Sequence, residues 1–219
     1  MIKYCIFDLD GTLLNTLTSI RYFLNASLLR LGFPEITLDE CRSFIGNGAR
    51  ILVCRALAAR GVTDNDAIES VLSDFKATYD ERPYYLTEPY PDIIKVIDEL
   101  LANGITLGVL SNKPDSALKS VVRSFFGDRF AFVSGGRENI PLKPDPTACL
   151  AMLCDMGAMP FDLAFIGDSD VDIETAKRVG AALSIGVSWG FRDRGELLLA
   201  GADKIADTAY DILKYVGVK

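Results

Sequence analysis

Two aspartates lie one residue apart where an apolar segment near the amino terminus ends. Residues 3–8 read KYCIFD, and Asp8 and Asp10 are followed by Gly11 and Thr12. A short run rich in β-forming residues that is interrupted by a glycine is typical of a buried strand. One carboxylate could attack a substrate while the other transfers protons, although a polar turn that closes a strand would give the same pattern.

A second acidic cluster follows another apolar run. Residues 163–166 read LAFI, and Asp168, Asp170 and Asp172 come within the next six residues. Three acids so close together repel one another unless a cation lies among them, and Mg²⁺ prefers such hard oxygen ligands. The alternatives are a calcium-like loop and acids that favour the start of a helix.

Two further segments carry groups that could bind phosphate. Ser111 and Asn112 follow the apolar residues 105–110, and a hydroxyl beside backbone amides at a strand end can hold phosphate oxygens. Lys143 opens the sequence KPDP, where we expect a helix to start, and could neutralise an attacked phosphoryl group. Ordinary turn residues and a solvated surface lysine are the alternatives.

The elements that must position these residues follow an alternating pattern. Helical patterns separate most of five short apolar runs, at residues 3–8, 105–110, 130–133, 163–166 and 182–187. Strands that alternate with helices predict an α/β fold with a doubly wound parallel sheet. The carboxyl ends of its strands are where such sheets bind ligands, so the acids and Ser111 are expected at one edge.

The first two predicted strands are separated by far more chain than one crossover helix needs. Four helical patterns fill the interval: residues 20–31 before Gly32, a capping box at 37–40, residues 51–59 and residues 68–79. We therefore predict an all-helical insert at residues 15–84. The catalytic core is predicted at residues 1–14 and 85–219.

Composition excludes several classes of function. The 219-residue chain has 49% hydrophobic residues, a net charge of -7 and no histidine. The negative charge argues against a nucleic-acid partner, and no apolar run is long enough for a membrane span. Without histidine, neither a Ser-His-Asp triad nor a histidine metal site can form. The five cysteines show no paired pattern, so we expect a cytoplasmic protein; the sequence does not indicate an oligomeric state.

The segment FDLDGTLLNT resembles the first signature of haloacid dehalogenase-like phosphatases, and the later signatures appear in order. The resemblance spans nearly the whole chain and implies a Rossmann-like core with a helical cap. It implies that Asp8 is the nucleophile and Asp10 the general acid and base. Asn15 departs from the pattern, since related phosphatases often carry aspartate there.

The same resemblance assigns roles to the remaining candidates. In the family signature GDxxxD the first and last acids bind metal, so Asp170 is left out. The implied ligands of Mg²⁺ are Asp8, the Asp10 backbone carbonyl, Asp168 and Asp172. Lys143 is implied in catalysis, and the expected phosphate-binding residues are Ser111, Asn112 and Thr12.

Longer segments resemble phosphoglycolate phosphatases in particular. They are FIGNGARILVCRAL, LSNKP, SGGRENIPLKPDP, GDSDVDIETAKRVGA and VSWGFRDRGELLLAGAD. The implied activity is Mg²⁺-dependent hydrolysis of a small phosphate monoester, most of all 2-phosphoglycolate, through an aspartyl-phosphate. The segment around Gly46, Asn47, Gly48 and Arg50 is expected to read the substrate, with Arg50 gripping its carboxylate. A plain interhelical turn with a solvated arginine is the alternative.

Other activities stay open at this point. The same segments are shared with phosphatases of sugar phosphates and pyrophosphate, and a β-phosphoglucomutase-like phosphotransferase has all four signatures. A dehalogenase lacks the second acid at the Asp10 position. A regulatory module that only binds phosphate is expected to have lost an acid, whereas Asp8, Asp10, Asp168 and Asp172 are all present.

Overall fold

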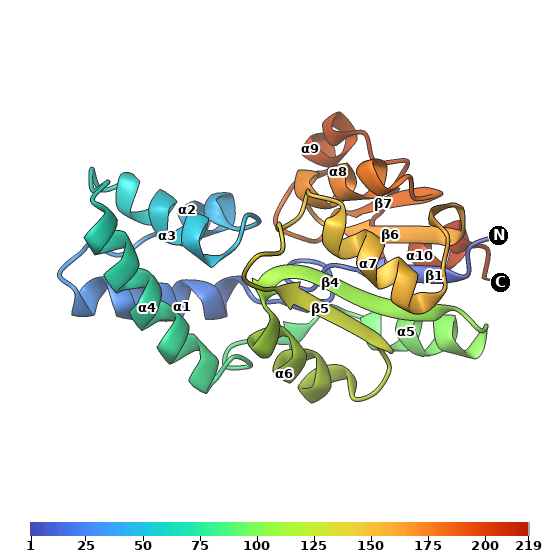
Figure 1. The fold of residues 1–219 in the computed structure, drawn as a ribbon, viewed down its shortest axis with the longest axis horizontal. Helices are drawn as coiled ribbons and strands as arrows, with labels where there is room; N and C mark the ends of the chain where they lie inside the picture. Colours follow the sequence, from blue (N-terminus) through green and yellow to red (C-terminus); the bar gives the residue numbers. More distant parts are fainter. Residues whose placement is uncertain (219) are drawn as a thin grey trace.

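The computed structural model describes residues 1–218, and a six-stranded parallel sheet forms its centre (Figure 1). The strands lie in the order β5-β4-β1-β6-β7-β8. Their bounds are β1 Tyr4–Phe7, β4 Thr106–Pro114, β5 Phe132–Gly136, β6 Leu163–Gly167, β7 Leu183–Val187 and β8 Lys204–Ala206. The chain runs outward from β1 to β5 and then outward from β6 to β8, so β1 and β6 flank the point where strand order reverses.

Helices cover both faces of this sheet. They are α5 Ile93–Ala102, α6 Asp115–Phe126, α7 Thr147–Met156, the 3-10 turn η1 Pro160–Asp162, α8 Asp170–Val179, α9 Arg194–Ala200 and α10 Ala209–Val216. Cys5 and Phe7 on β1 face the apolar cluster shared with α5, α6 and α10, whereas Ile6 faces the cluster shared with α7 and α8. Such alternation is the period-two pattern of a strand buried on both sides. The predicted doubly wound α/β fold is confirmed.

The segment between β1 and α5 forms four helices that surround an apolar core of their own. They are α1 Leu17–Arg30, α2 Leu38–Phe44, α3 Ala49–Ala58 and α4 Asn65–Glu81. Thr37 forms the expected capping box with Glu40 at the start of α2. The buried face of α4 carries the predicted apolar repeat from Ile68 to Tyr79. We call these four helices the cap; their status as a separate domain at residues 15–84 stays a prediction.

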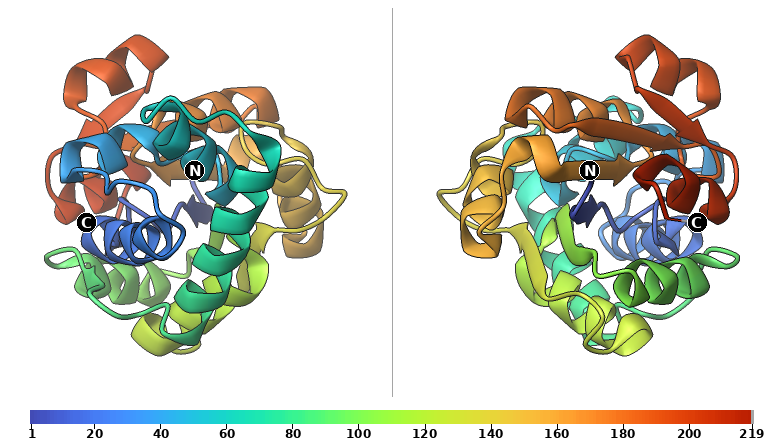
Figure 2. Two further views of the ribbon diagram at one scale, coloured as in Figure 1. Left: turned by 90° about the vertical axis from the view of Figure 1, so that its left-hand side faces the viewer. Right: turned by 90° about the vertical axis from the view of Figure 1, so that its right-hand side faces the viewer.

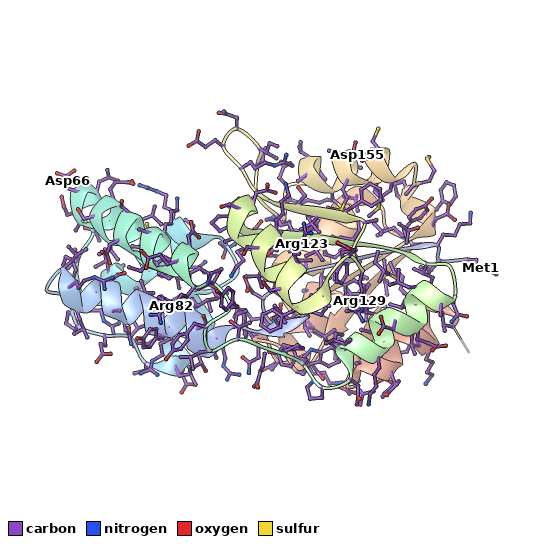
Figure 3. All side chains as sticks on the ribbon, turned by 90° about the horizontal axis from the view of Figure 1, so that it is seen from below. Met1, Asp66, Arg82, Arg123, Arg129 and Asp155 are labelled. Carbon is purple, nitrogen blue, oxygen red and sulfur yellow. The ribbon has the colours of Figure 1, made fainter. Side chains whose placement is uncertain are left out.

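A short ribbon joins the cap to the sheet region. Strand β2, Leu14–Asn15, pairs antiparallel with β3, Glu88–Pro89, so the chain enters and leaves the cap side by side. In Figure 1 the arrow of β5 points toward the cap, and both termini lie at the opposite end. Figure 2 (left) shows α1 and α4 in front of the sheet when viewed from the cap side, and Figure 3 places Asp66 of α4 far from Met1.

Several element boundaries differ from those expected. Residues 111–114 were expected as a turn, but β4 continues to Pro114, with an irregular register between Leu110 and Pro114. Helix α7 begins at Thr147, so Lys143 lies in the preceding loop and does not start the helix. The ribbon and β8 were not predicted, because strands of two or three residues carry almost no periodicity. Among residues 1–218, no helix is long and apolar enough to cross a bilayer.

Candidate active site

Two aspartates stand side by side because two neighbouring strands end side by side. β1 ends at Phe7 and β6 at Gly167, and these strands pair in parallel, so Asp8 and Asp168 follow at the same edge. The Asp8 amide donates to the Ile166 carbonyl at 2.9 Å, which extends the ladder by one residue. The sheet register therefore places the backbone of both aspartates at this edge, whatever contacts their side chains make.

A third aspartate reaches this edge from the first turn of α8. Carboxylate oxygens of Asp8, Asp168 and Asp172 all lie within 4.8 Å of one another, and the three residues are buried. Asp172 also closes the capping box of α8, since its Oδ2 accepts from the Ser169 amide at 3.1 Å and from Ser169 Oγ at 2.6 Å. Asp172 therefore caps the helix with Oδ2 and presents Oδ1 to the cluster.

The Asp168 carboxylate fits into a space left by two glycines. A Cβ on Gly11, where φ is +88°, would lie 2.2 Å from Asp168 Oδ2, and a Cβ on Gly190 would lie 2.2 Å from Asp168 Cβ. Oδ2 accepts from the Phe191 amide at 2.8 Å, and Oδ1 accepts from Thr12 Oγ1 at 3.3 Å. The glycine after the DxD pair thus makes room for the Asp168 carboxylate as well as for the turn.

Lys143 is buried among these acids. Its Nζ lies 3.0 Å from Asp8 Oδ1 and donates to Asp172 Oδ1 at 2.6 Å, with 3% of the lysine side chain exposed. Asn112 holds the lysine backbone from both sides: its Oδ1 accepts from the Lys143 amide at 2.8 Å, and its Nδ2 donates to the Lys143 carbonyl at 2.9 Å. The side chain of Asn112 therefore positions the backbone of Lys143.

Burial and mutual repulsion disturb the titration of this cluster. Burial raises the pKa of Asp8 to about 6; Lys143 opposes the shift, and Asp172 and Asp10 add to it. Burial and the nearby Asp172 and Asp8 hold the pKa of Asp168 well above its usual range. Burial alone would lower the pKa of Lys143, but Asp172 and Asp8 raise it above the usual value. Lys143 thus does not fully compensate the negative charge of the three acids at this edge.

The donor set fits a divalent cation. Asp8 Oδ1 is buried and has no hydrogen-bond partner among residues 1–218, although Lys143 Nζ is 3.0 Å away. Three buried carboxylates that share one small space offer the hard oxygen ligands that Mg²⁺ takes, and they leave room for water and phosphate in its shell. The residues present therefore suit Mg²⁺ better than a softer metal, which would call for sulfur or imidazole ligands.

A cavity that is partly open to solvent lies between this edge and the cap. Its core side includes the predicted residues Asp8, Asp10, Ser111, Asn112, Lys143, Asp168 and Asp172. Its cap side includes the predicted Gly46 and Gly48 and is otherwise mainly apolar, formed by Ile20, Ile45, Ala49, Leu52, Phe75 and Tyr79. The acids and Lys143 are therefore on the core wall, whereas the cap wall is mainly apolar and also carries the charged residues Lys76 and Asp80.

Three predicted residues do not line this cavity. Thr12 is fully buried behind Asp168, to which its hydroxyl donates. Asn47 accepts from Arg55 Nη2 at 2.9 Å within the cap. Arg50 pairs with Glu69 and donates to Asn65 Oδ1 at 2.9 Å, with 48% of its side chain exposed.

The physical reason for the placement of Arg50 is local. A carboxylate and an amide on α4 satisfy its guanidinium at the outer side of the cap, and Arg50 is absent from the cavity wall. The guanidinium therefore does not line the cavity as expected, and its contact with a substrate carboxylate stays a prediction. Gly46 and Gly48, from the same segment, do reach the wall.

Several polar cavity residues were not among the predicted site residues, namely Lys76, Tyr79, Asp80, Lys113, Ser169 and Arg192. Lys113, next to Asn112, is buried and contacts Asp10; Tyr79 fits the apolar repeat of α4; Arg192 lies after the carboxyl end of β7. Arg192 Nη1 donates to the Arg42 carbonyl at 2.9 Å and Nη2 to the Ile45 carbonyl at 2.8 Å. Its position after a strand end was the available signal for Arg192, whereas Tyr79 resembled an ordinary core residue.

Comparisons with known proteins agree with this geometry. A family model described as haloacid dehalogenase-like hydrolase matches residues 5–185. Phosphoglycolate phosphatase 1 of Pseudomonas aeruginosa is 34% identical over 197 residues, which cover 86% of this chain and 71% of that protein. The phosphoglycolate phosphatase of Vibrio vulnificus strain CMCP6 is 31% identical over 221 residues, covering 98% and 96%. A crystal structure from Lactobacillus delbrueckii subsp. bulgaricus, 30% identical, superposes with a TM-score of 0.93 and 98% coverage of both chains.

Proposed function

The chain belongs to the haloacid dehalogenase-like hydrolases and is a phosphoric monoester hydrolase, and we propose that it cleaves 2-phosphoglycolate through a phosphorylated Asp8. The observation that carries this proposal is the convergence of the acids and Lys143 on one cavity wall. Four carboxylates with two buried ammonium groups, those of Lys143 and Lys113, suit transfer of a phosphoryl group, because that reaction depends on positioning and on charge compensation.

In the proposed first step, an Asp8 carboxylate oxygen attacks phosphorus as the bond to the leaving oxygen breaks. Lys143 lies 3.0 Å from Asp8 Oδ1 and compensates charge on the nucleophile and the transferring group. The Ser111 hydroxyl, at the same wall, donates to a phosphate oxygen.

Asp10 handles the protons. It lies two residues after the nucleophile, and its side chain also reaches the cavity. Asp10 gives its proton to the departing alkoxide and then takes a proton from the water that attacks the phosphorus of the aspartyl-phosphate. Water attack breaks the bond between Asp8 and phosphorus, so Asp8 is recovered and inorganic phosphate leaves.

Asp8, the Asp10 backbone carbonyl, Asp168 and Asp172 would hold Mg²⁺, in keeping with the cluster of buried carboxylates. The bound ion would supply positive charge to orient the phosphate and to offset the charge that develops on it. Lys143 alone cannot neutralise three acids, which is why the proposed activity requires the metal.

The choice of 2-phosphoglycolate is supported by the curated relatives, which are named phosphoglycolate phosphatases at 28–34% identity. The cavity is also lined by three cationic side chains outside the acidic cluster, Lys76, Lys113 and Arg192. Lys113 is already paired with Asp10 and Tyr79, so Lys76 and Arg192 are the charges left for a substrate. A small substrate with a carboxylate would be favoured by such charges over a neutral ester.

The experiment that tests this function measures phosphate release from a panel of phosphorylated metabolites. The panel includes 2-phosphoglycolate, pyrophosphate and sugar phosphates, each with Mg²⁺ and with excess chelator. We expect 2-phosphoglycolate to have the highest kcat/KM and activity to vanish without Mg²⁺. Preference for another ester would overturn the substrate, and full activity in chelator would overturn the metal site.

The variant Asp8→Asn tests the nucleophile in the same assay. The amide is almost the same shape as the carboxylate but cannot attack, so we expect turnover to fall by roughly four orders of magnitude or more. Exposed Asp170, which is outside the cluster, provides the matched control Asp170→Asn. Substantial turnover by Asp8→Asn would contradict the phosphorylated intermediate.

A further inference from the structure

A buried lysine joins the second aspartate of the DxD pair to the cap. Lys113 Nζ donates to Asp10 at 3.2 Å from Oδ1 and 3.4 Å from Oδ2, and it donates to Tyr79 Oη at 2.7 Å. The lysine side chain is 5% exposed and the Asp10 side chain 13%. The three donors of this ammonium thus have partners on both the core and the cap.

The tyrosine that receives this hydrogen bond is held rigidly by the cap. Its ring packs edge-on against Phe23 at 5.3 Å and tilted against Phe75 at 5.6 Å, and Tyr79 is 5% exposed. The Lys113 ammonium lies 4.5 Å from the centre of the Tyr79 ring, so the ring face and the hydroxyl both contact it. Since the ring is fixed on α4, the location of its hydroxyl depends on where the cap lies.

The contact matters because the proton transfer proposed for Asp10 is sensitive to geometry. A general acid must be within hydrogen-bond reach of the leaving oxygen. Asp10 has no other side-chain hydrogen bond among residues 1–218, so Lys113 is the group that restrains its carboxylate. Lys113 in turn makes its shortest hydrogen bond to Tyr79.

We propose that Tyr79 is a positioning residue for Asp10: its hydroxyl fixes the Lys113 ammonium, which orients the Asp10 carboxylate when the cap lies over the core. This inference rests on the role of Asp10 in the proposed function. Proton delivery is complete only in the capped arrangement, because α4 carries the hydroxyl and the core carries the lysine and the acid.

The leaving group provides a specific readout. An alkoxide such as glycolate needs a proton as it departs, whereas p-nitrophenolate is stable without one. The ratio kcat/KM reports the steps up to and including departure of the alcohol, so a misplaced Asp10 should affect only the substrate that needs the proton. Damage to cap packing or to phosphate binding would instead lower kcat/KM for both substrates.

The test is Tyr79→Phe, which removes the hydroxyl and keeps the ring that packs against Phe23 and lies near Lys113. We expect kcat/KM for 2-phosphoglycolate to fall about ten-fold, since a hydrogen bond to a charged group is lost, and that for p-nitrophenyl phosphate to change by less than about two-fold. Tyr85→Phe is the matched control: Tyr85 is 38% exposed and also packs against Phe23, and we expect no change on either ester.

A double-mutant cycle shows whether Tyr79 acts through Lys113. Lys113→Met should reproduce the selective loss, and Tyr79→Phe should add little in the Lys113→Met background, because contacting residues are not additive. Equal losses on both esters, full additivity, or no loss would each overturn the positioning role. A wild-type protein that releases phosphate from neither ester would overturn the proposed function itself, before any variant is compared.

Discussion

Lys143 Nζ lies 3.0 Å from Asp8 Oδ1, and the same ammonium donates to Asp172 at 2.6 Å. Asp172 is fully buried, and 3% of the Lys143 side chain is exposed, so water contributes little to the solvation of this cluster. The sheet edge and the first turn of α8 supply the acids, and the loop before α7 supplies the cation. The lysine therefore serves both the stability of the metal-free protein and the proposed chemistry.

Replacing this lysine should affect stability and activity together. Lys143→Met keeps much of the side-chain volume but leaves Asp8 and Asp172 without their cation. Removing one partner of a buried ion pair costs about 3–5 kcal/mol. We therefore expect chemical denaturation in chelator to show that the free energy of unfolding falls by this amount. Turnover should fall about 10²- to 10³-fold, as when one transition-state donor is removed.

An exposed ion pair gives the control for this variant. Lys119 pairs with Asp115 at 2.7 Å, with 55% of the lysine side chain exposed. Lys119→Met should leave turnover unchanged, because such surface pairs contribute little. If Lys143→Met were as stable and as active as Lys119→Met, neither role of Lys143 would hold.

The raised pKa values predict how stability depends on pH in the absence of metal. Asp8 has a pKa of about 6 in the folded protein instead of 3.8, so the folded state holds more protons than the unfolded state between these values. The free energy of unfolding should therefore decrease as pH rises through this window. The pKa of Asp168 is also raised above its usual range, which acts in the same direction. Binding of Mg²⁺ requires the ionised acids, so its stabilising effect should increase over the same range.

Thermal unfolding at pH 5 and pH 7.5, with Mg²⁺ and with chelator, measures this linkage without any substrate. We expect Mg²⁺ to raise Tm more at pH 7.5 than at pH 5. Asp168→Asn should abolish the increase, whereas Asp170→Asn should preserve it because Asp170 is exposed and outside the cluster. An equal effect of Mg²⁺ at both pH values would contradict a site built from acids with raised pKa values.

Calcium should compete with magnesium and inhibit. Ca²⁺ accepts more oxygen ligands with looser geometry, so it can engage both carboxylate oxygens of Asp8. An oxygen held in this way cannot attack phosphorus. Titration of Ca²⁺ into the Mg²⁺-activated enzyme should suppress phosphate release and should be reversed by more Mg²⁺; equal activity with either ion would argue against Asp8 as the nucleophile.

The parts of the site that could be predicted from sequence are those fixed by local chain signals. Asp8 and Asp168 each follow an apolar run, and the rule that parallel strands place their carboxyl ends at one edge brings them together. Ser111 follows from the same rule. The predicted place of Lys143 depended on resemblance to a family, because an isolated KPDP segment does not distinguish a buried lysine from a solvated one.

The contacts between cap and core could not be predicted in this way. Tyr79 fits the apolar repeat of α4, and nothing in that repeat reveals that its hydroxyl meets Lys113, 34 positions along the chain. Arg50 was expected at the cavity because it follows two glycines, yet Glu69 on α4 provides a nearer partner. Both outcomes depend on how helices pack against distant segments, which periodicity does not specify.

The extent of β4 shows a related difficulty. Asn112 and Pro114 are frequent turn residues, and they led to the expectation that the strand ends at Leu110. The structure pairs Pro114 with Gly136 beyond an irregularity in the register. A proline without an amide proton is tolerated next to such an irregularity, and the local sequence alone does not reveal the partner strand.

Two arginines near the cap loop should respond differently to removal. Arg192 lies on the cavity wall and donates to the carbonyls of Arg42 and Ile45, so it ties the core to the end of α2. Arg50 instead makes its side-chain contacts within the cap, to Glu69 and Asn65. Arg192→Ala should raise KM about ten-fold for both 2-phosphoglycolate and p-nitrophenyl phosphate, because charge-assisted hydrogen bonds that hold the cap are lost.

Arg50→Ala serves as the matched comparison and tests the carboxylate-reading role expected from the sequence. We expect its kcat/KM values on 2-phosphoglycolate and p-nitrophenyl phosphate to stay within about two-fold of wild type, since surface ion pairs contribute little. A loss confined to 2-phosphoglycolate would mean that Arg50 leaves Glu69 and reaches the substrate carboxylate during turnover. An Arg192→Ala variant with unchanged KM would show that its two hydrogen bonds to the cap do not govern closure. Both variants remove a guanidinium that contacts the cap, but only Arg192 links the cap to the core, so the difference between them separates the effect of that link from the effect of losing a charge.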